Sequence, residues 1–170
     1  MRKILLGLSF VLALVVLVSS VSAIISQPIP VYVDIKPESW PNPFQLMGRG
    51  LLPVAILGTE EFDAAQVDPC TIKLTRETVG EGVSPIRWSW EDVATPYTAD
   101  MGGGHEEGPD GYLDLTLKFK IQEVIDTLDL DELNDGDVIM LIITGNLMEE
   151  YSGTPIEGED CIWIQAGIHA

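Results

Sequence analysis

The chain has 170 residues, and its 27 acidic residues against nine basic ones give a formal net charge of −18. Such a surface repels nucleic acid and anionic membranes, because binding to either requires a basic face. It suits divalent cations, or solubility in salty surroundings. The length is sufficient for one domain with its own hydrophobic core.

The N-terminus has the pattern of a secretory signal peptide. Arg2 and Lys3 precede the apolar run Ile4–Val18, and small residues follow as far as Ala23. We expect residues 1–23 to be removed after Ala23, which leaves a single domain of residues 24–170 outside the cell. An uncleaved anchor is the alternative, but the run is shorter than the ~20 residues of a membrane span. No later segment is long and apolar enough, so we expect no membrane span after cleavage.

The segments that follow carry strand patterns. They alternate apolar and polar residues, or run apolar throughout, and turn residues separate them. In chain order they are residues 30–35, 51–57, 71–76, 86–92, 112–120, 137–147 and 161–168. The segment 151–160 has the pattern of a hairpin connection with a kink at Gly158.

Helical signals are few. Ile121, Val124, Ile125 and Leu128 follow the i, i+3, i+4, i+7 rule and predict one short helix, and residues 59–68 suggest a single helical turn. About seven strands with one short helix predict an all-β fold. We expect an antiparallel β-sandwich of the immunoglobulin-like or jelly-roll-like kind.

Two cysteines, Cys70 and Cys161, are present. An even count in an exported chain indicates a disulfide, which would join the first half of the domain to its last strand. Two buried thiols are the alternative. A zinc site does not fit, because only His105 and His169 could complete it, and the spacing matches no zinc pattern.

The segment GPDGYLDLTLKF, residues 108–119, raises the question of a metal site. Asp110, Gly111 and Asp114 are spaced like the second half of a calcium loop, and Tyr112 would supply a backbone carbonyl. A contiguous EF-hand is excluded, because the front half is poor and no bidentate Glu follows. An Asp-Gly turn before a strand explains the same residues, so both interpretations stay open.

Several segments together resemble a poorly characterised family of secreted bacterial and archaeal surface modules. They are VDIKPESWPNPF, GLLPVAILGTEEFDAAQVDPCTIKL, WEDV, DGYLDLTLKF and GTPIEGEDCIWI, and they span Val33 to Ile164. In that family the stretch E-D-V-N-G-D-G-Y-L-D-L is continuous and resembles a calcium loop. The resemblance therefore implies Asp92 as a first ligand, together with Asp110, Tyr112 and Asp114, across an insertion of residues 94–109. It also implies that the two cysteines stand where small polar residues are usual, which favours a bridge between them.

Four tryptophans raise the question of sugar binding. Trp88 and Trp90 lie on one side of a predicted strand, where an exposed pair could stack on a sugar ring, although such residues more often cover a core. Nothing in the sequence indicates catalysis: no G-x-S-x-G is present, and adjacent acids such as Glu91 and Asp92 face opposite sides of a strand.

The sequence therefore predicts an exported, non-catalytic structural or interaction module, at the cell surface or in the medium. We expect one calcium ion and one disulfide to stabilise it, and a protein or glycan at the cell surface to be its partner. A carbohydrate-binding module that uses Trp88 and Trp90 is the alternative, and a hydrolase is a weaker one.

Overall fold

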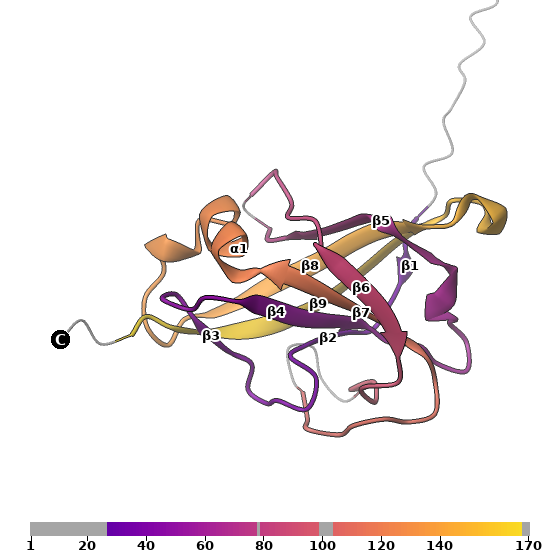
Figure 1. The fold of residues 1–170 in the computed structure, drawn as a ribbon, viewed down its shortest axis with the longest axis horizontal. Helices are drawn as coiled ribbons and strands as arrows, with labels where there is room; N and C mark the ends of the chain where they lie inside the picture. Colours follow the sequence, from indigo (N-terminus) through magenta and orange to yellow (C-terminus); the bar gives the residue numbers. More distant parts are fainter. Residues whose placement is uncertain (1–26, 78, 99–103, 168–170) are drawn as a thin grey trace, which may run out of the picture.

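The computed structural model describes residues 27–77, 79–98 and 104–167, so the predicted signal peptide lies outside the described residues. Within them, nine strands form two sheets that pack face to face, with one short helix at an end (Figure 1). The predicted all-β sandwich is confirmed, with two short strands more than expected.

The larger sheet, here the β9 sheet, has the order β1–β9–β8–β5, and β3 also pairs with β9. The smaller one, the β7 sheet, has the order β2–β4–β7–β6. The strands are β1 (Ile29–Pro30), β2 (Val33–Ile35), β3 (Pro43–Gln45), β4 (Leu51–Ile56), β5 (Val67–Thr75), β6 (Arg87–Glu91), β7 (Asp114–Lys120), β8 (Val138–Leu147) and β9 (Pro155–Gln165). Pairing is antiparallel except that β1 and β3 run parallel to β9.

The core lies between the sheets. Alternation on β7 points Leu115, Leu117 and Phe119 inward, and all three are fully buried. Ile162 and Ile164 of β9 face them from the other sheet within the same cluster. Each such side chain contributes about 1.5–3 kcal/mol by leaving water, which is the main reason that these segments form strands here.

The helical segments lie at the margins of the sandwich. Helix α1 (Ile121–Thr127) follows β7 and buries Val124 and Ile125. Single 3-10 turns occupy Ala64–Gln66, Leu130–Glu132 and Glu149–Tyr151. Both helical predictions are thus confirmed, and in the described part of the chain no helix is long and apolar enough to cross a membrane.

One predicted boundary is corrected at Gly158. The last strand begins at Pro155 rather than at Cys161, so Gly158 lies inside it and not at a hairpin kink. A Cβ atom at Gly158 would collide with the carbonyl oxygen of Val31, where the chain passes from β1 to β2 and changes sheets. The glycine therefore permits a close backbone approach.

The predicted disulfide is not formed in the structure. Cys70 is exposed on β5, whereas Cys161 is buried on β9, and strand β8 lies between them. Strands two places apart are separated by roughly 9.5 Å, beyond the usual Cα separation of about 5.5–6 Å across a disulfide. The register adds an offset, because Cys161 pairs with Met140 while Cys70 lies between the residues that pair with Thr144 and Asn146.

Candidate functional site

The loop that joins β6 to β7 brings the predicted calcium residues together. The carboxylate of Asp92 accepts hydrogen bonds from the backbone N–H groups of Asp110, at 3.0 Å, and Gly111, at 2.8 Å. Gly111 has φ 99°, a turn conformation that favours glycine. The inserted residues therefore leave Asp92 beside the Asp-Gly turn, as the predicted loop requires.

Asp114, the first residue of β7, directly follows this loop and is completely buried. Its Oδ1 accepts a hydrogen bond from Gly58 N–H at 2.9 Å, and its Oδ2 accepts from Val93 at 2.8 Å and Ala94 at 3.2 Å. Burial raises the pKa of the Asp114 carboxyl, while the three backbone hydrogen bonds oppose that rise. Through these hydrogen bonds, the Asp114 carboxylate connects the start of β7 to Gly58 and to the segment that follows β6.

These carboxylates are used as hydrogen-bond acceptors for the backbone. Every oxygen of Asp92 and Asp114 receives at least one N–H group, and Asp110 accepts a hydrogen bond from Tyr112 N–H at 2.9 Å. In the described part of the chain, no group of three or more His, Cys, Asp and Glu side chains is placed to hold a metal ion. The loop closes by hydrogen bonds, and calcium at these residues stays a prediction.

The aromatic pair lies on an edge strand. β6 is the last strand of the β7 sheet, and Trp88 and Trp90 pair with the buried Leu117 and Leu115. Cross-strand partners share a face, so both rings lie on the core side of the sheet. They are nevertheless 40% and 39% exposed, because they stand at the rim of the sandwich.

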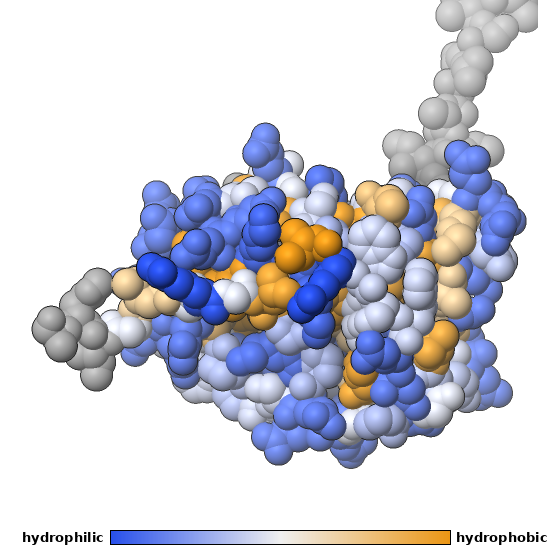
Figure 2. All heavy atoms as spheres, in the orientation of Figure 1, coloured by the Kyte–Doolittle hydropathy of each residue, from blue (hydrophilic) through white to orange (hydrophobic). Residues whose placement is uncertain are grey.

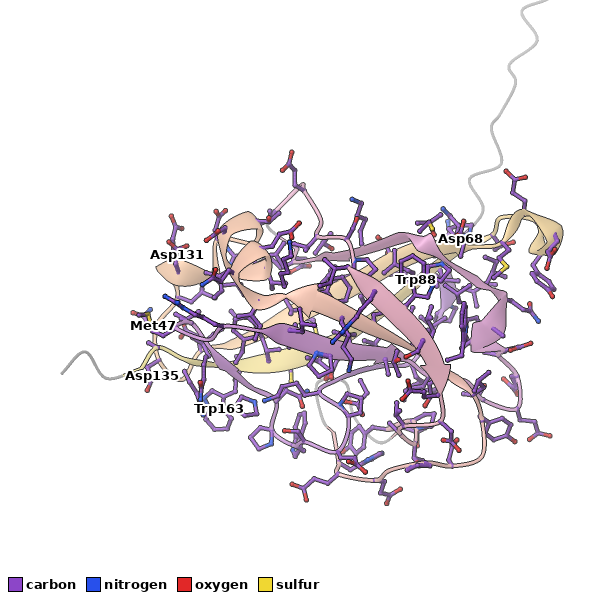
Figure 3. All side chains as sticks on the ribbon, in the orientation of Figure 1. Met47, Asp68, Trp88, Asp131, Asp135 and Trp163 are labelled. Carbon is purple, nitrogen blue, oxygen red and sulfur yellow. The ribbon has the colours of Figure 1, made fainter. Side chains whose placement is uncertain are left out.

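Ile86 extends this pair by two more residues. Ile86 is exposed, and its N–H donates to the carbonyl oxygen of Lys118 in β7. This hydrogen bond extends the pairing of β6 with β7 to Ile86. We call Ile86, Trp88 and Trp90 the β6 stripe. Figure 2 shows apolar and near-neutral side chains gathered over β6 between hydrophilic ones, and Figure 3 places Trp88 there.

A third exposed tryptophan, Trp163, was not predicted as a site residue. Trp163 of β9 lies beside its cross-strand partner Val138, and both are exposed. They border an apolar hollow of about 260 Å³, whose further lining includes Trp40 and Pro41. In Figure 3, Trp163 lies well away from Trp88. The alternation of CIWIQ, which places Trp163 opposite to Ile162 and Ile164, is the signal that could have located it.

The outer face of the β7 sheet carries an open cleft of about 320 Å³. Its acidic lining residues are Glu38, Glu91 and Asp92, and Lys118 lies among them. The Asp92 carboxylate already accepts hydrogen bonds from two backbone N–H groups of the loop. Glu91 accepts a hydrogen bond of 2.6 Å from the Ser89 hydroxyl. Among the described residues, no aromatic side chain lines this cleft, so they offer no stacking surface for a sugar there.

A small cavity of about 30 Å³ lies beside β2 and the middle of β9, and Asp34, Asn42 and Asp160 help to line it. Asp160 accepts hydrogen bonds from Ile35 N–H at 2.7 Å, Cys161 N–H at 2.7 Å and the Asn42 side chain at 3.0 Å. The cavity thus joins both sheets through buried polar groups. No pattern in the sequence indicates this cavity.

The acids of this cavity have displaced pKa values. Burial, then the charges of Asp160 and Asp114, raises the pKa of Asp34 to about 7. Burial also raises the pKa of Asp160 to about 6, against its three hydrogen bonds. Both groups therefore bind protons more tightly in the folded chain than in the unfolded one.

This predicts that, in chelator, the free energy of unfolding rises as the pH falls from 8 to 5. Between the unfolded pKa of 3.8 and about 7 the folded state holds more protons, so stability decreases with rising pH. Denaturant unfolding of the wild type and Asp34→Asn would measure it. The Asp34→Asn variant keeps His105 and Tyr97, which line the same cavity. We expect it to lose most of the pH dependence of the free energy of unfolding. A stability that is flat or rises over this range would contradict the prediction.

Comparison of the chain with family models, curated proteins and solved structures finds no match. The resemblance to secreted surface modules therefore stays a prediction from the quoted motifs.

Proposed function

We propose that this domain is an exported, non-catalytic interaction module, at the cell surface or in the medium, that binds its partner through the β6 stripe. The observation that carries the proposal is the exposure of Trp88 and Trp90 on an edge strand. Large aromatic side chains with one face free are the residue type that dominates binding energy at protein interfaces.

The edge position adds a second argument. A strand at a sheet edge leaves backbone N–H and C=O groups unpaired, and proteins usually protect such edges with charge, proline or bulges. β6 instead presents two tryptophans, with Arg87 and Glu91 beside them. A partner can therefore use both the backbone edge and the aromatic rings, as in β-strand addition. The formal charge of −18 disfavours acidic partners.

A glycan is the second candidate partner. The condition for carbohydrate binding is that Trp88 or Trp90 is exposed, and both are. Their spacing of two residues on one strand places the rings on the same side, where they could stack on successive sugar units. The half-buried position of the rings at the rim favours a narrow contact over a broad flat platform.

The non-catalytic part of the proposal rests on the acidic cleft. Hydrolysis of a glycoside needs two carboxyl groups free to act across a bound substrate. In the cleft, the Asp92 carboxylate is bound by two backbone N–H groups and Glu91 by the Ser89 hydroxyl. Both are engaged in holding the local structure.

Replacement of both stripe tryptophans by threonine, which suits an edge strand, is expected to weaken partner binding at least ~10-fold. Retention by the source organism's envelope fraction and by a glycan array would be compared for wild type and variant. Trp163→Thr is the matched control, because it removes an exposed tryptophan from the other sheet.

Envelope retention without array signal would identify a protein partner, and array signal would identify a glycan. Equal retention of the stripe variant and the wild type, or an equal loss in Trp163→Thr, would contradict the proposal. Circular dichroism would establish that each variant is folded.

A further inference from the structure

The side chain of Asn42, which helps to line the small cavity between β2 and β9, carries an amide oxygen that has no hydrogen-bond partner among the described residues. Asn42 is 2% exposed, and its Nδ2 donates to Asp160 Oδ2, at 3.0 Å, and to the carbonyl oxygen of Cys161, at 2.9 Å. Both partners are acceptors, so the nitrogen must face them and the amide cannot be flipped. Its Oδ1 is then buried with no hydrogen bond from the described residues. A buried carbonyl oxygen in this state requires a donor or a cation.

The two carboxylates at the cavity, Asp34 and Asp160, also lack a positively charged partner among the described residues. Asp34 and Asp160 line the same space, and the charge of Asp114 reaches Asp34 as well. Within the described residues, no hydrogen bond to the Asp34 carboxylate is found, and every influence on its pKa is one that raises it. Among the described residues, no basic side chain contributes to the pKa shifts of Asp34 and Asp160. Buried carboxylates are normally paired or coordinated to a metal.

We propose that this cavity binds one hard divalent cation of the calcium class, held by the carboxylates of Asp34 and Asp160 and by Oδ1 of Asn42. Two carboxylates balance the two positive charges. Calcium accepts amide and hydroxyl oxygens beside carboxylates, and the Ser39 hydroxyl and water can add to the ligands. The volume of about 30 Å³ has room for one ion.

This site is separate from the predicted calcium loop. Its ligands come from β2, from the segment before β3 and from β9, so they belong to both sheets. The ion would tie β2 of the β7 sheet to β9 of the β9 sheet. Because it binds only the folded chain, it would stabilise the domain wherever calcium is abundant.

The test uses the folded chain at pH 8, where Asp34 is ionised. Calcium is expected to raise the melting temperature of the wild type relative to chelator, and Asp34→Asn is expected to abolish the rise. Asp126→Asn, on α1, is the neutral control and keeps the rise. Asp92→Asn reports on the loop and also keeps the rise.

Terbium gives a readout independent of stability. Trp40 lines the cavity, so terbium bound there is expected to luminesce on excitation of tryptophan and to be displaced by calcium. Trp40→Phe is expected to lose most of that emission but to keep the calcium-dependent rise in melting temperature. Three results would each overturn the proposal: no rise in the wild type, a rise that survives in Asp34→Asn, or a rise that is lost in Asp92→Asn.

Discussion

Replacing Asp114 by alanine is expected to lower the free energy of unfolding by about 3 kcal/mol. The substitution leaves the N–H groups of Gly58, Val93 and Ala94 without their acceptor in or near the core. A buried donor without a partner costs about 1–3 kcal/mol. Removal of a desolvated charge offsets part of the sum, since burial opposes the ionised form of Asp114.

Urea unfolding measures this effect, and Asp110→Ala is the matched control. Asp110 belongs to the same loop, but its carboxylate is exposed and accepts one hydrogen bond, from Tyr112 N–H. We expect this control to cost about 1 kcal/mol or less. If the two variants were equally stable, Asp114 would not be the residue that holds the loop.

Gly58→Ala is expected to destabilise the fold by about 2 kcal/mol or more. A Cβ atom at Gly58 would collide with the carbonyl oxygen of Leu113, and backbone on both sides cannot yield as a flexible side chain would. The same residue donates its N–H to Asp114. A shift that relieves the collision therefore lengthens that hydrogen bond.

Gly80→Ala is the control for this substitution, because nothing lies within 4 Å of its Cβ position. We expect its free energy of unfolding to change by no more than ~0.5 kcal/mol, or to rise slightly as the unfolded chain loses freedom. Thermal and urea unfolding of both variants would be compared. Similar stabilities would show that the approach of Gly58 to Leu113 is not a constraint on the fold.

The fold could be predicted because alternation is a local signal. Leu115, Leu117 and Phe119 alternate with polar residues, and that pattern alone indicates which face of β7 packs against the other sheet. The two short strands β1 and β3 carry no such pattern. They consist of two and three residues with a proline each, and they exist because β9 offers them a pairing edge.

The candidate sites were predictable only in part. Asp92 and Asp110 were placed together by motif, and their hydrogen bond agrees with that arrangement. Asp114 was expected to belong to a calcium loop or to a turn before a strand, and its burial under Gly58 and the segment after β6 was not predicted. That cover depends on how loops fold over the sheet, which the sequence pattern does not encode.

Contacts between residues far apart in the sequence are the other feature that could not be predicted. Asn42 and Asp160 are separated by 118 residues, and only the pairing of β3 with β9 brings their segments together. The disulfide prediction was unreliable for the same reason. An even number of cysteines gives no information about how the strands pair. In the observed pairing, Cys161 lies opposite Met140 and away from Cys70.

The proposed binding role of the β6 stripe can be tested most directly by site-specific photocross-linking. A photoreactive phenylalanine analogue would replace Trp90 in one sample and exposed Glu123 of α1 in another, and each would be incubated with the source organism's envelope fraction. We predict a discrete adduct from position 90 alone. Excess wild-type domain should abolish it, and excess stripe variant should not. An adduct that forms equally from both positions, or that the stripe variant competes away, would contradict the proposed function.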